Sequence, residues 1–295
     1  MSEPTYLDAS SILSLLASDP AEHKDGPTIL MHLLGCARRV RLDSVVGDGD
    51  VLAPENEKRN VGTLTHKLVE LYHRGVNPLR FVAQITGHPI IDALLNGPSD
   101  NGPAAWPMAA YYQEAFPVGF WGALVGAEIH LERQGLHGRQ TGRLDAVWAV
   151  DTEAVARIEA RFPGVRLCGP GLYGWDLKTA GQRDNNMHEA YLHDPQPFRY
   201  LSLLMSTEGG LGCGAGPVRG FLVLKAIRYK TAKQDRFQLV CLPADEVLSV
   251  ENTKRQSEIE RLAKLAMTVD EARPTMCYGY GRMCPHFNTG LCPGY

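Results

Sequence analysis

The second half of the chain consists of short apolar runs separated by turns, and this pattern limits the fold more than any other feature of the sequence. From about residue 118 onward the chain contains GALVGAEIHLER, RLDAVWAVD, GLYGWDLKTA, RGFLVLKAIRYK and RFQLVCLP, which have the length and the apolar or alternating character of strands. Much of the remaining chain has helical periodicity. We therefore expect an α/β fold.

The helices are predicted mainly in the first half of the chain. In VGTLTHKLVELYHRG, Leu64, Leu68 and Leu71 recur at helical spacing, and His66 lies on another face. The polar segment APENEKRN, at residues 53–60, is expected to interrupt the chain before this helix. Further helices are expected over residues 10–22, 28–39, 77–95, 104–116, 153–161 and 244–267.

The composition is that of a globular protein. With 295 residues, of which 44% are hydrophobic and 21% charged, the chain can bury a large core as one elaborated domain or two small ones. No run of about 18 or more apolar residues occurs, and MSEPTYLDAS lacks the regions of a signal peptide, so we expect a cytoplasmic protein without membrane contact. The net charge of -3 gives no general attraction to nucleic acid, so any DNA contact must come from a local basic groove.

The predicted strand GLYGWDLKTA carries two opposite charges, Asp176 and Lys178, in an otherwise apolar run. Side chains alternate along a strand, so both charges lie on one face and Trp175 and Leu177 lie on the other. A salt bridge at the edge of a sheet is the structural explanation for such a pair. The functional explanation is that both charges belong to a catalytic site.

A second predicted strand, GRLDAVWAV, has one acidic residue among apolar ones. Alternation places Leu144, Ala146 and Trp148 on one side and Asp145 on the other. If the two strands are neighbours, the carboxylates of Asp145 and Asp176 converge. Two close carboxylates suit a hard divalent cation such as Mg²⁺, and such an ion polarises a phosphoryl oxygen and activates water in phosphodiester cleavage.

The helix expected after GLYGWDLKTA has a clear start signal. Asp194 and Pro195 are typical of a helix beginning, and Gln196 and Tyr200 lie four residues apart on one face. We expect Gln196 and Tyr200, with Arg199 nearby, to bind DNA by contacting a phosphate or stacking on a base. The alternative is that Tyr200 packs at the rim of the core and Gln196 caps the helix.

These motifs follow one another in a characteristic order: a Gly-x-x-x-His helix, a G-R-L-D strand, a D-x-K strand and a Q-x-x-x-Y helix. This order resembles the RecB-type branch of the PD-(D/E)xK nucleases over residues 36–200. The resemblance implies a restriction-endonuclease-like nuclease core, in which a mixed central sheet is flanked by helices. It also implies one nuclease domain over residues 1–295, with a helical insertion at about residues 76–117.

The resemblance implies a metal-dependent active site. Lys178 corresponds to the catalytic lysine, and Asp176 stands where glutamate is commoner in the family. Mg²⁺ or Mn²⁺ would be bound by the other members of the catalytic set, His66, Asp145 and Asp176, and by the backbone carbonyl of Leu177.

The cysteines suggest a second metal site. Seven cysteines, an odd number, argue against a disulfide framework in a chain of cytosolic character. Cys277, Cys284 and Cys292 lie near the C-terminus, too widely spaced for a zinc ribbon, and Cys36 is a fourth thiol. This split arrangement resembles the iron–sulfur nucleases, which include the AddB nuclease domain, exonuclease V and CRISPR-adaptation nucleases. It implies a [4Fe-4S] clasp that joins Cys36 to residues 277–292; Zn²⁺ and four unrelated thiols are the alternatives.

The predicted function is metal-dependent hydrolysis of DNA phosphodiester bonds. By the resemblance, the substrate is single-stranded DNA or DNA with free ends, and the activity is that of an exonuclease. Recombination, repair, and CRISPR or phage DNA processing are the settings it implies, with recombination or CRISPR-adaptation proteins as partners. The alternatives are a catalytically silent nuclease-fold subunit for DNA binding or assembly, a zinc-stabilised interaction module and a sequence-specific restriction enzyme.

Overall fold

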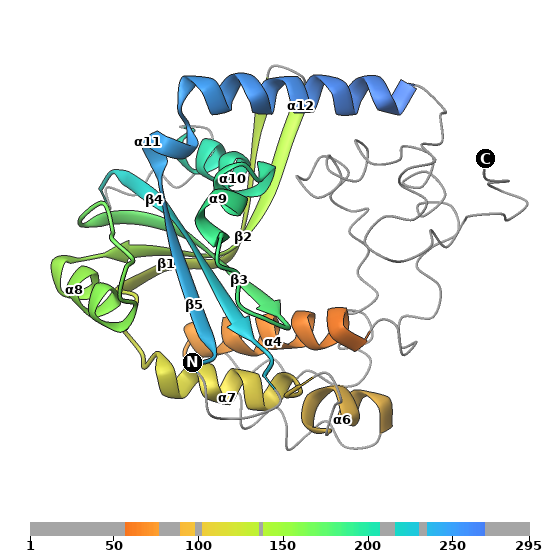
Figure 1. Cartoon of the computed structure of the whole chain (residues 1–295), viewed down its shortest axis with the longest axis vertical. Coiled ribbons are helices and arrows are strands. Elements are labelled where there is room, and N and C mark those ends of the chain that lie inside the picture. Colours follow the sequence, from red (N-terminus) through yellow and green to blue (C-terminus); the bar gives the residue numbers. More distant parts are fainter. Residues whose placement is uncertain are drawn as a thin grey trace, which may run out of the picture.

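The computed structural model describes residues 57–76, 89–97, 102–135, 138–206, 216–229 and 235–268. In this part the chain forms one five-stranded mixed sheet flanked by helices (Figure 1). The predicted α/β class is therefore confirmed.

The sheet contains one parallel strand pair among antiparallel ones. The strands lie in the order in which they occur in the chain: β1 (Ala123–Gly135), β2 (Gly138–Val150), β3 (Gly171–Ala180), β4 (Val218–Ile227) and β5 (Phe237–Pro243). β3 and β4 are parallel, and the other neighbouring pairs are antiparallel. A parallel pair requires a crossover connection. Two helices, α9 (Met187–Leu192) and α10 (Pro195–Met205), lie within that connection.

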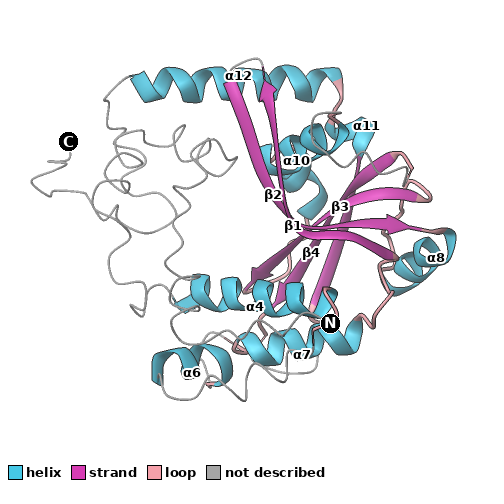
Figure 2. Cartoon of the chain, turned by 180° about the vertical axis from the view of Figure 1, so that it is seen from behind, coloured by secondary structure: helices cyan, strands magenta, loops and turns pink. Residues whose placement is uncertain are grey.

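The remaining helices lie around the sheet (Figure 2). They are α4 (Glu57–His73), α6 (Pro89–Asn96), α7 (Ala105–Ala115), α8 (Thr152–Arg161), α11 (Ala244–Val247) and α12 (Val250–Thr268). α4 and α7 pack against each other at one end of the molecule, and α12 lies at the other end, where the β1–β2 hairpin reaches it (Figures 1 and 2).

Each face of the sheet has its own apolar core. On one face, aromatic residues of the strands pack against α7 and α8, with Tyr112, Phe116 and Trp175 among the most buried side chains. On the other face, α10 packs through Leu201 and Leu203. The sheet is thus covered on both sides, as expected for strands with nearly continuous apolar runs.

A histidine lies within the aromatic core. The ring of His73, at the end of α4, packs edge-on against Trp148 and Trp175, with centroids 4.9 and 5.2 Å away. Tyr112 Oη accepts a hydrogen bond from Trp121 Nε1 at 2.7 Å and also bonds His73 Nε2, 2.8 Å away. Burial lowers the pKa of His73 to about 3, and its imidazole is therefore neutral.

The predicted start of α10 is confirmed. The Asp194 side chain accepts a hydrogen bond from the N–H of Gln196, and Pro195 occupies the first turn. The predicted helix at 153–161 is also present as α8, capped by Asp151. The local start signal of α10 was therefore sufficient to find that helix.

Three local predictions are wrong. Residues 57–60 form the first turn of α4 and not a polar break, because Asn60 is buried and Glu57 pairs with Arg228 at 3.5 Å. The helix expected at 244–267 is divided into α11 and α12 around Ser249. The side chain of Leu144 packs on the face of the sheet that α10 covers, whereas Ala146 packs on the opposite face. The regular alternation of side chains along β2 is therefore interrupted near this point.

Several predicted features lie outside the described residues. They are the helices at 10–22 and 28–39, most of the helix at 77–95, and the four proposed cluster ligands Cys36, Cys277, Cys284 and Cys292. None of the helices in the described ranges is both long and apolar enough to span a bilayer.

Candidate active site

The carboxylate of Asp145 joins α4, β2 and β3. Its Oδ2 atom lies 3.2 Å from Nδ1 of His66 on α4. The same oxygen accepts a hydrogen bond of 2.8 Å from the backbone N–H of Leu177 on β3. Helix α4 supplies His66 from the face opposite its buried leucines.

The position of Asp145 follows from the way β2 and β3 separate. Their antiparallel pairing ends at Ala146 and Trp175, one residue before Asp145 and Asp176 would face each other. The N–H of Leu177 still points toward β2 and bonds the Asp145 side chain. A carboxylate thus takes the place of a backbone acceptor where the strands diverge.

Asp176 is enclosed by Lys178 and by α10. Its Oδ2 atom lies 2.8 Å from Nζ of Lys178, and Oδ1 accepts a hydrogen bond of 3.3 Å from Nε2 of Gln196. Gln196 also donates to the hydroxyl of Tyr200 at 3.1 Å. Asp176 is only 3% exposed, whereas about a third of the Lys178 side chain is accessible.

Charges within the site shift the titration of the His66–Asp145 pair. Burial alone would raise the pKa of Asp145, but the neighbouring His66, Lys178 and the N–H of Leu177 outweigh it, and the pKa is lowered. Burial would lower the pKa of His66, but Asp145 and, less strongly, Asp176 raise it. Both shifts favour the charged pair.

Asp176 and Lys178 respond differently. Burial raises the pKa of Asp176 to about 6, against the opposing effect of the Lys178 ammonium; Asp145 raises it further. Burial disfavours the charged form of Lys178, but the two carboxylates outweigh it and raise its pKa. Lys178 is therefore a cation at neutral pH.

His66, Asp145 and Lys178 line a cavity of about 360 Å³. This cavity also contains a residue that the sequence patterns did not indicate, Glu128 on β1. Glu128 lies opposite Asp145 in the β1–β2 register, since Ala127 pairs with Ala146 and Ile129 with Leu144.

The backbone at Glu128 has a positive φ of 54°, an unusual value for a residue other than glycine. The Glu128 side chain pairs with Arg143 at 2.9 Å. Burial, together with Asp145, raises the pKa of Glu128. The pairing register that brings Glu128 beside Asp145 could not be derived from either strand alone.

The DNA-binding prediction for Arg199 is not supported by its position. Its side chain is 5% exposed and pairs with Glu260 on α12 at 2.7 Å. Glu260 also accepts hydrogen bonds from Gln140 at the tip of the β1–β2 hairpin. Arg199 therefore ties α10 to α12, and no DNA contact is assigned to it.

Tyr200 packs against the core, which was the alternative to a DNA contact for this residue. Tyr200 is 6% exposed, and its ring lies so close to Gly142 that a Cβ there would be 2.7 Å away. A ring in this position is not available to stack on a base. Gln196 does not cap the helix through its side chain; it bonds Asp176 and Tyr200.

The donor atoms present suit a hard divalent cation, although they are paired with one another. An imidazole and two carboxylates match the preferences of Mn²⁺ and Mg²⁺. Asp176 Oδ2 is buried and accepts no well-directed hydrogen bond from described residues, despite the nearby ammonium of Lys178. No three His, Cys, Asp or Glu side chains in the described ranges are already grouped as ligands. The chemistry of the donors fits, and the ligand geometry is not formed in advance.

Comparison with known proteins gives no family assignment. No family model matches the chain, and no curated protein matches it. Among solved structures, the crystal structure of SSO0001 is similar with a TM-score of 0.36 and 15% sequence identity, over 85% of this chain and 80% of that one.

Proposed function

We propose that this chain is a metal-dependent nuclease of the RecB-type PD-(D/E)xK class that hydrolyses DNA phosphodiester bonds. The observation that supports this best is the convergence of His66, Asp145, Asp176 and Lys178 from α4, β2 and β3. These are the residues that the motif order predicts for one site. Holding two carboxylates, an imidazole and an ammonium together in a partly buried group is costly, which favours a chemical role for the group.

His66, Asp145 and Asp176 would hold Mg²⁺ or Mn²⁺, with the carbonyl of Leu177 as a further ligand. The bound ion would supply Lewis acidity toward a phosphoryl oxygen and would lower the pKa of a bound water. Metal binding requires the ionised form of Asp176. The carboxylates would then give up part of their interaction with His66 and Lys178 and would bind the cation.

Lys178 has a role that follows from its charge. Its raised pKa keeps it protonated, so it cannot take a proton from water at neutral pH. It can donate hydrogen bonds to an attacking water or to a phosphate oxygen, where its charge offsets the negative charge that develops in the transition state. About a third of the side chain is accessible, as this role requires.

Gln196 would act as a positioning residue. It bonds the Asp176 oxygen that is turned away from Lys178 and is itself oriented by Tyr200. The orientation of Asp176 is therefore fixed from α10 as well as from β3. Such support is typical of ligand carboxylates.

The finer parts of the proposal come from the family resemblance. They are exonuclease action on single strands or free ends, and a [4Fe-4S] clasp formed by Cys36, Cys277, Cys284 and Cys292. A cluster-containing protein should be brown and contain about four irons per chain. Stoichiometric zinc without iron would contradict the cluster.

A catalytically silent DNA-binding subunit is the second candidate. It is favoured by one observation, the mutual pairing of the acidic groups with His66 and Lys178 in place of a formed ligand set. The two functions share a fold and differ in metal binding. Calorimetric titration with Mn²⁺ separates them, because a silent subunit should not bind the ion at this site.

Cleavage of end-labelled DNA tests the proposal. The full chain should degrade single-stranded DNA with Mg²⁺ or Mn²⁺ and should be inactive in EDTA. Asp145→Ala and Lys178→Ala should each lose about 100-fold or more of this activity. Glu153→Ala, an exposed change on α8, is the control and should retain it. Full activity in both site variants would refute the catalytic assignment.

A further inference from the structure

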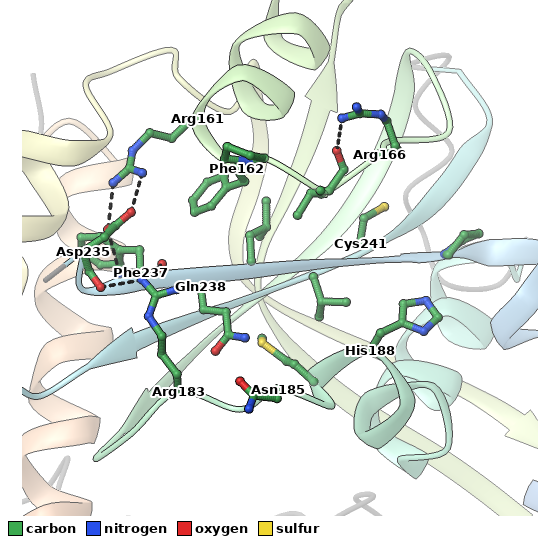
Figure 3. A pocket seen from close by; sticks show the side chains of 17 residues that line it. Arg161, Phe162, Arg166, Arg183, Asn185, His188, Asp235, Phe237, Gln238 and Cys241 are labelled. Atoms are coloured by element: carbon green, nitrogen blue, oxygen red, sulfur yellow. Dashed lines mark hydrogen bonds and ion pairs between the residues drawn. The ribbon is translucent and has the colours of Figure 1, made fainter.

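A groove of about 690 Å³ follows the outer edge of β5, the last strand of the sheet in the described part of the chain (Figure 3). The consecutive residues 237–241 of β5 form its floor. One wall runs from Arg161, the last residue of α8, to Arg166, and the other is the segment from Arg183 to His188. The groove therefore opens onto the outer edge of β5 between walls on both faces of the sheet.

The backbone of β5 directs alternate residues into this groove. The backbone carbonyl of Arg236 accepts a hydrogen bond of 2.7 Å from the N–H of Ile227. The backbone N–H and C=O groups of the even-numbered residues of β5 therefore point toward β4. The N–H and C=O groups of Phe237, Leu239 and Cys241 consequently point outward. Edge groups of this kind can pair with a further strand.

The first part of this edge is already occupied. Phe237 donates to Asp235 Oδ1, and its carbonyl, like that of Asp235, accepts from Arg183. For the outward backbone groups of Leu239 and Cys241, no partner is found among the described residues. Leu239 and Cys241 are only 6% and 7% exposed, and both line the floor of the groove, so an added strand would reach them from within the groove.

A neighbouring segment shows how the edge holds extended chain. The side chain of Gln238 accepts from the N–H of Asp184 at 3.0 Å and donates to the C=O of Asp184. The side-chain amide thus imitates one step of strand pairing beside the open positions. This contact also fixes the wall that carries Arg183.

The walls carry positive charge that is only partly compensated. Arg161 forms a two-point ion pair with Asp235. Arg166 and Arg183 are exposed, and the hydrogen bonds found for them in the described chain go to backbone carbonyls. One of these two guanidinium groups lies on each side of the β5 edge (Figure 3).

We propose that this groove binds an extended acidic peptide segment of a partner protein, which adds as a strand to β5 at Leu239 and Cys241. Side chains alternate along an added strand, so acidic residues at adjacent positions would face Arg166 and Arg183 respectively. Backbone pairing would supply binding, and the two walls would select acidic side chains. This inference is independent of the proposed nuclease activity.

Peptide selection on the intact chain tests the inference. Phage-displayed random peptides about ten residues long should yield extended sequences enriched in Asp and Glu. A selected peptide, fluorescently labelled, should lose about tenfold or more in affinity with Arg166→Glu. The control Arg255→Glu makes the same charge change on the exposed surface of α12 and should bind like wild type. N-methylation of alternate peptide amides should abolish binding, because it removes the strand hydrogen bonds.

Other results would overturn the inference. These are failure to enrich peptides above a blank support, selection of basic or neutral peptides, or binding that survives both Arg166→Glu and N-methylation. A concentration-dependent dimer in light scattering that Arg166→Glu abolishes would assign the groove to a second copy of the chain. If no peptide binds, and oligo-dT binds in a way that depends on Arg166, the groove would be assigned to single-stranded DNA.

Discussion

The backbone N–H of Leu177 donates a hydrogen bond to Asp145 Oδ2 over 2.8 Å, at the point where β2 and β3 stop pairing. The divergence of the strands leaves space beside β3, and α4 brings His66 into it. The position of the proposed site is therefore set by backbone geometry. Four predictions follow from this arrangement and from the packing around it.

Replacement of Gly62 should disturb the site through a steric contact. A Cβ at position 62 would lie 2.8 Å from Thr179 Oγ1, so Gly62→Ala should force α4 away from β3. We expect the steric cost, about 1–3 kcal/mol, to exceed the helix-propensity gain of up to about 1 kcal/mol. His66 lies one turn further along α4, so DNA cleavage should also fall.

A second substitution and a control make this test specific. Gly62→Ala combined with Thr179→Ala removes Oγ1 and should restore both stability and cleavage, measured by urea unfolding and DNA degradation. Gly181→Ala should be harmless, since a Cβ there meets nothing within 4 Å. If Gly62→Ala is as stable as Gly181→Ala, the close packing of α4 on β3 is wrong.

Loss of Glu260 should destabilise the fold. Glu260→Ala removes the carboxylate that pairs with the buried Arg199 and accepts from Gln140. Removing one partner of a buried ion pair costs about 3–5 kcal/mol. Glu258→Ala, which removes an exposed pair with Arg261, should leave the unfolding midpoint close to that of the wild type. Equal unfolding midpoints in denaturant for the two variants would contradict the role given to Arg199.

Tyr200 should contribute to stability through its hydroxyl and its ring. Tyr200→Phe removes the bond to Gln196 and should lower the free energy of unfolding by about 1 kcal/mol, whereas Tyr200→Ala should cost about 3–5 kcal/mol. Gel-shift measurements should show that Tyr200→Phe retains its affinity for DNA. Unchanged stability with weakened DNA binding would restore the role predicted from the sequence.

His73 should make the protein sensitive to acid. Its folded-state pKa of about 3 lies below the usual 6.5, so between these values the unfolded chain binds a proton that the folded chain does not. Stability from this residue is fully present above pH 6.5 and is lost as the pH falls toward 3. The slope is up to about 1.4 kcal/mol per pH unit.

Thermal unfolding between pH 7 and pH 5 measures this effect. His73→Gln should lower stability at pH 7 but should reduce its dependence on pH. Val118→Gln, a change at an exposed position without a titratable group, should keep the pH dependence of the wild type. The same pH dependence in His73→Gln and wild type would show that His73 does not titrate as its burial requires.

Much of the fold could be predicted from local sequence signals. The alternating runs located β1 to β5, and the Asp-Pro start located α10, because strand periodicity and capping depend on neighbouring residues. The parity of Asp176 and Lys178 placed both charges on one side of β3. Their ion pair agrees with that placement.

The remaining features depend on contacts between distant parts of the chain. Arg199 is paired with a residue 61 positions later, so its sequence surroundings could not show that it is buried. Glu128 meets Asp145 only through the register of β1 and β2. The first turn of α4 depends on an ion pair between Glu57 and Arg228, which are far apart in the sequence.

The single parallel strand pair has a consequence for biosynthesis. β2 and β3 are made close together, so a growing chain can bring Asp145 and Asp176 near each other before β4 exists. β3 becomes an interior strand only after the crossover helices and β4 have left the ribosome. Until then its open edge is exposed beside a pair of acidic groups, and a nascent chain at this stage should depend most on chaperones that shield unpaired strands.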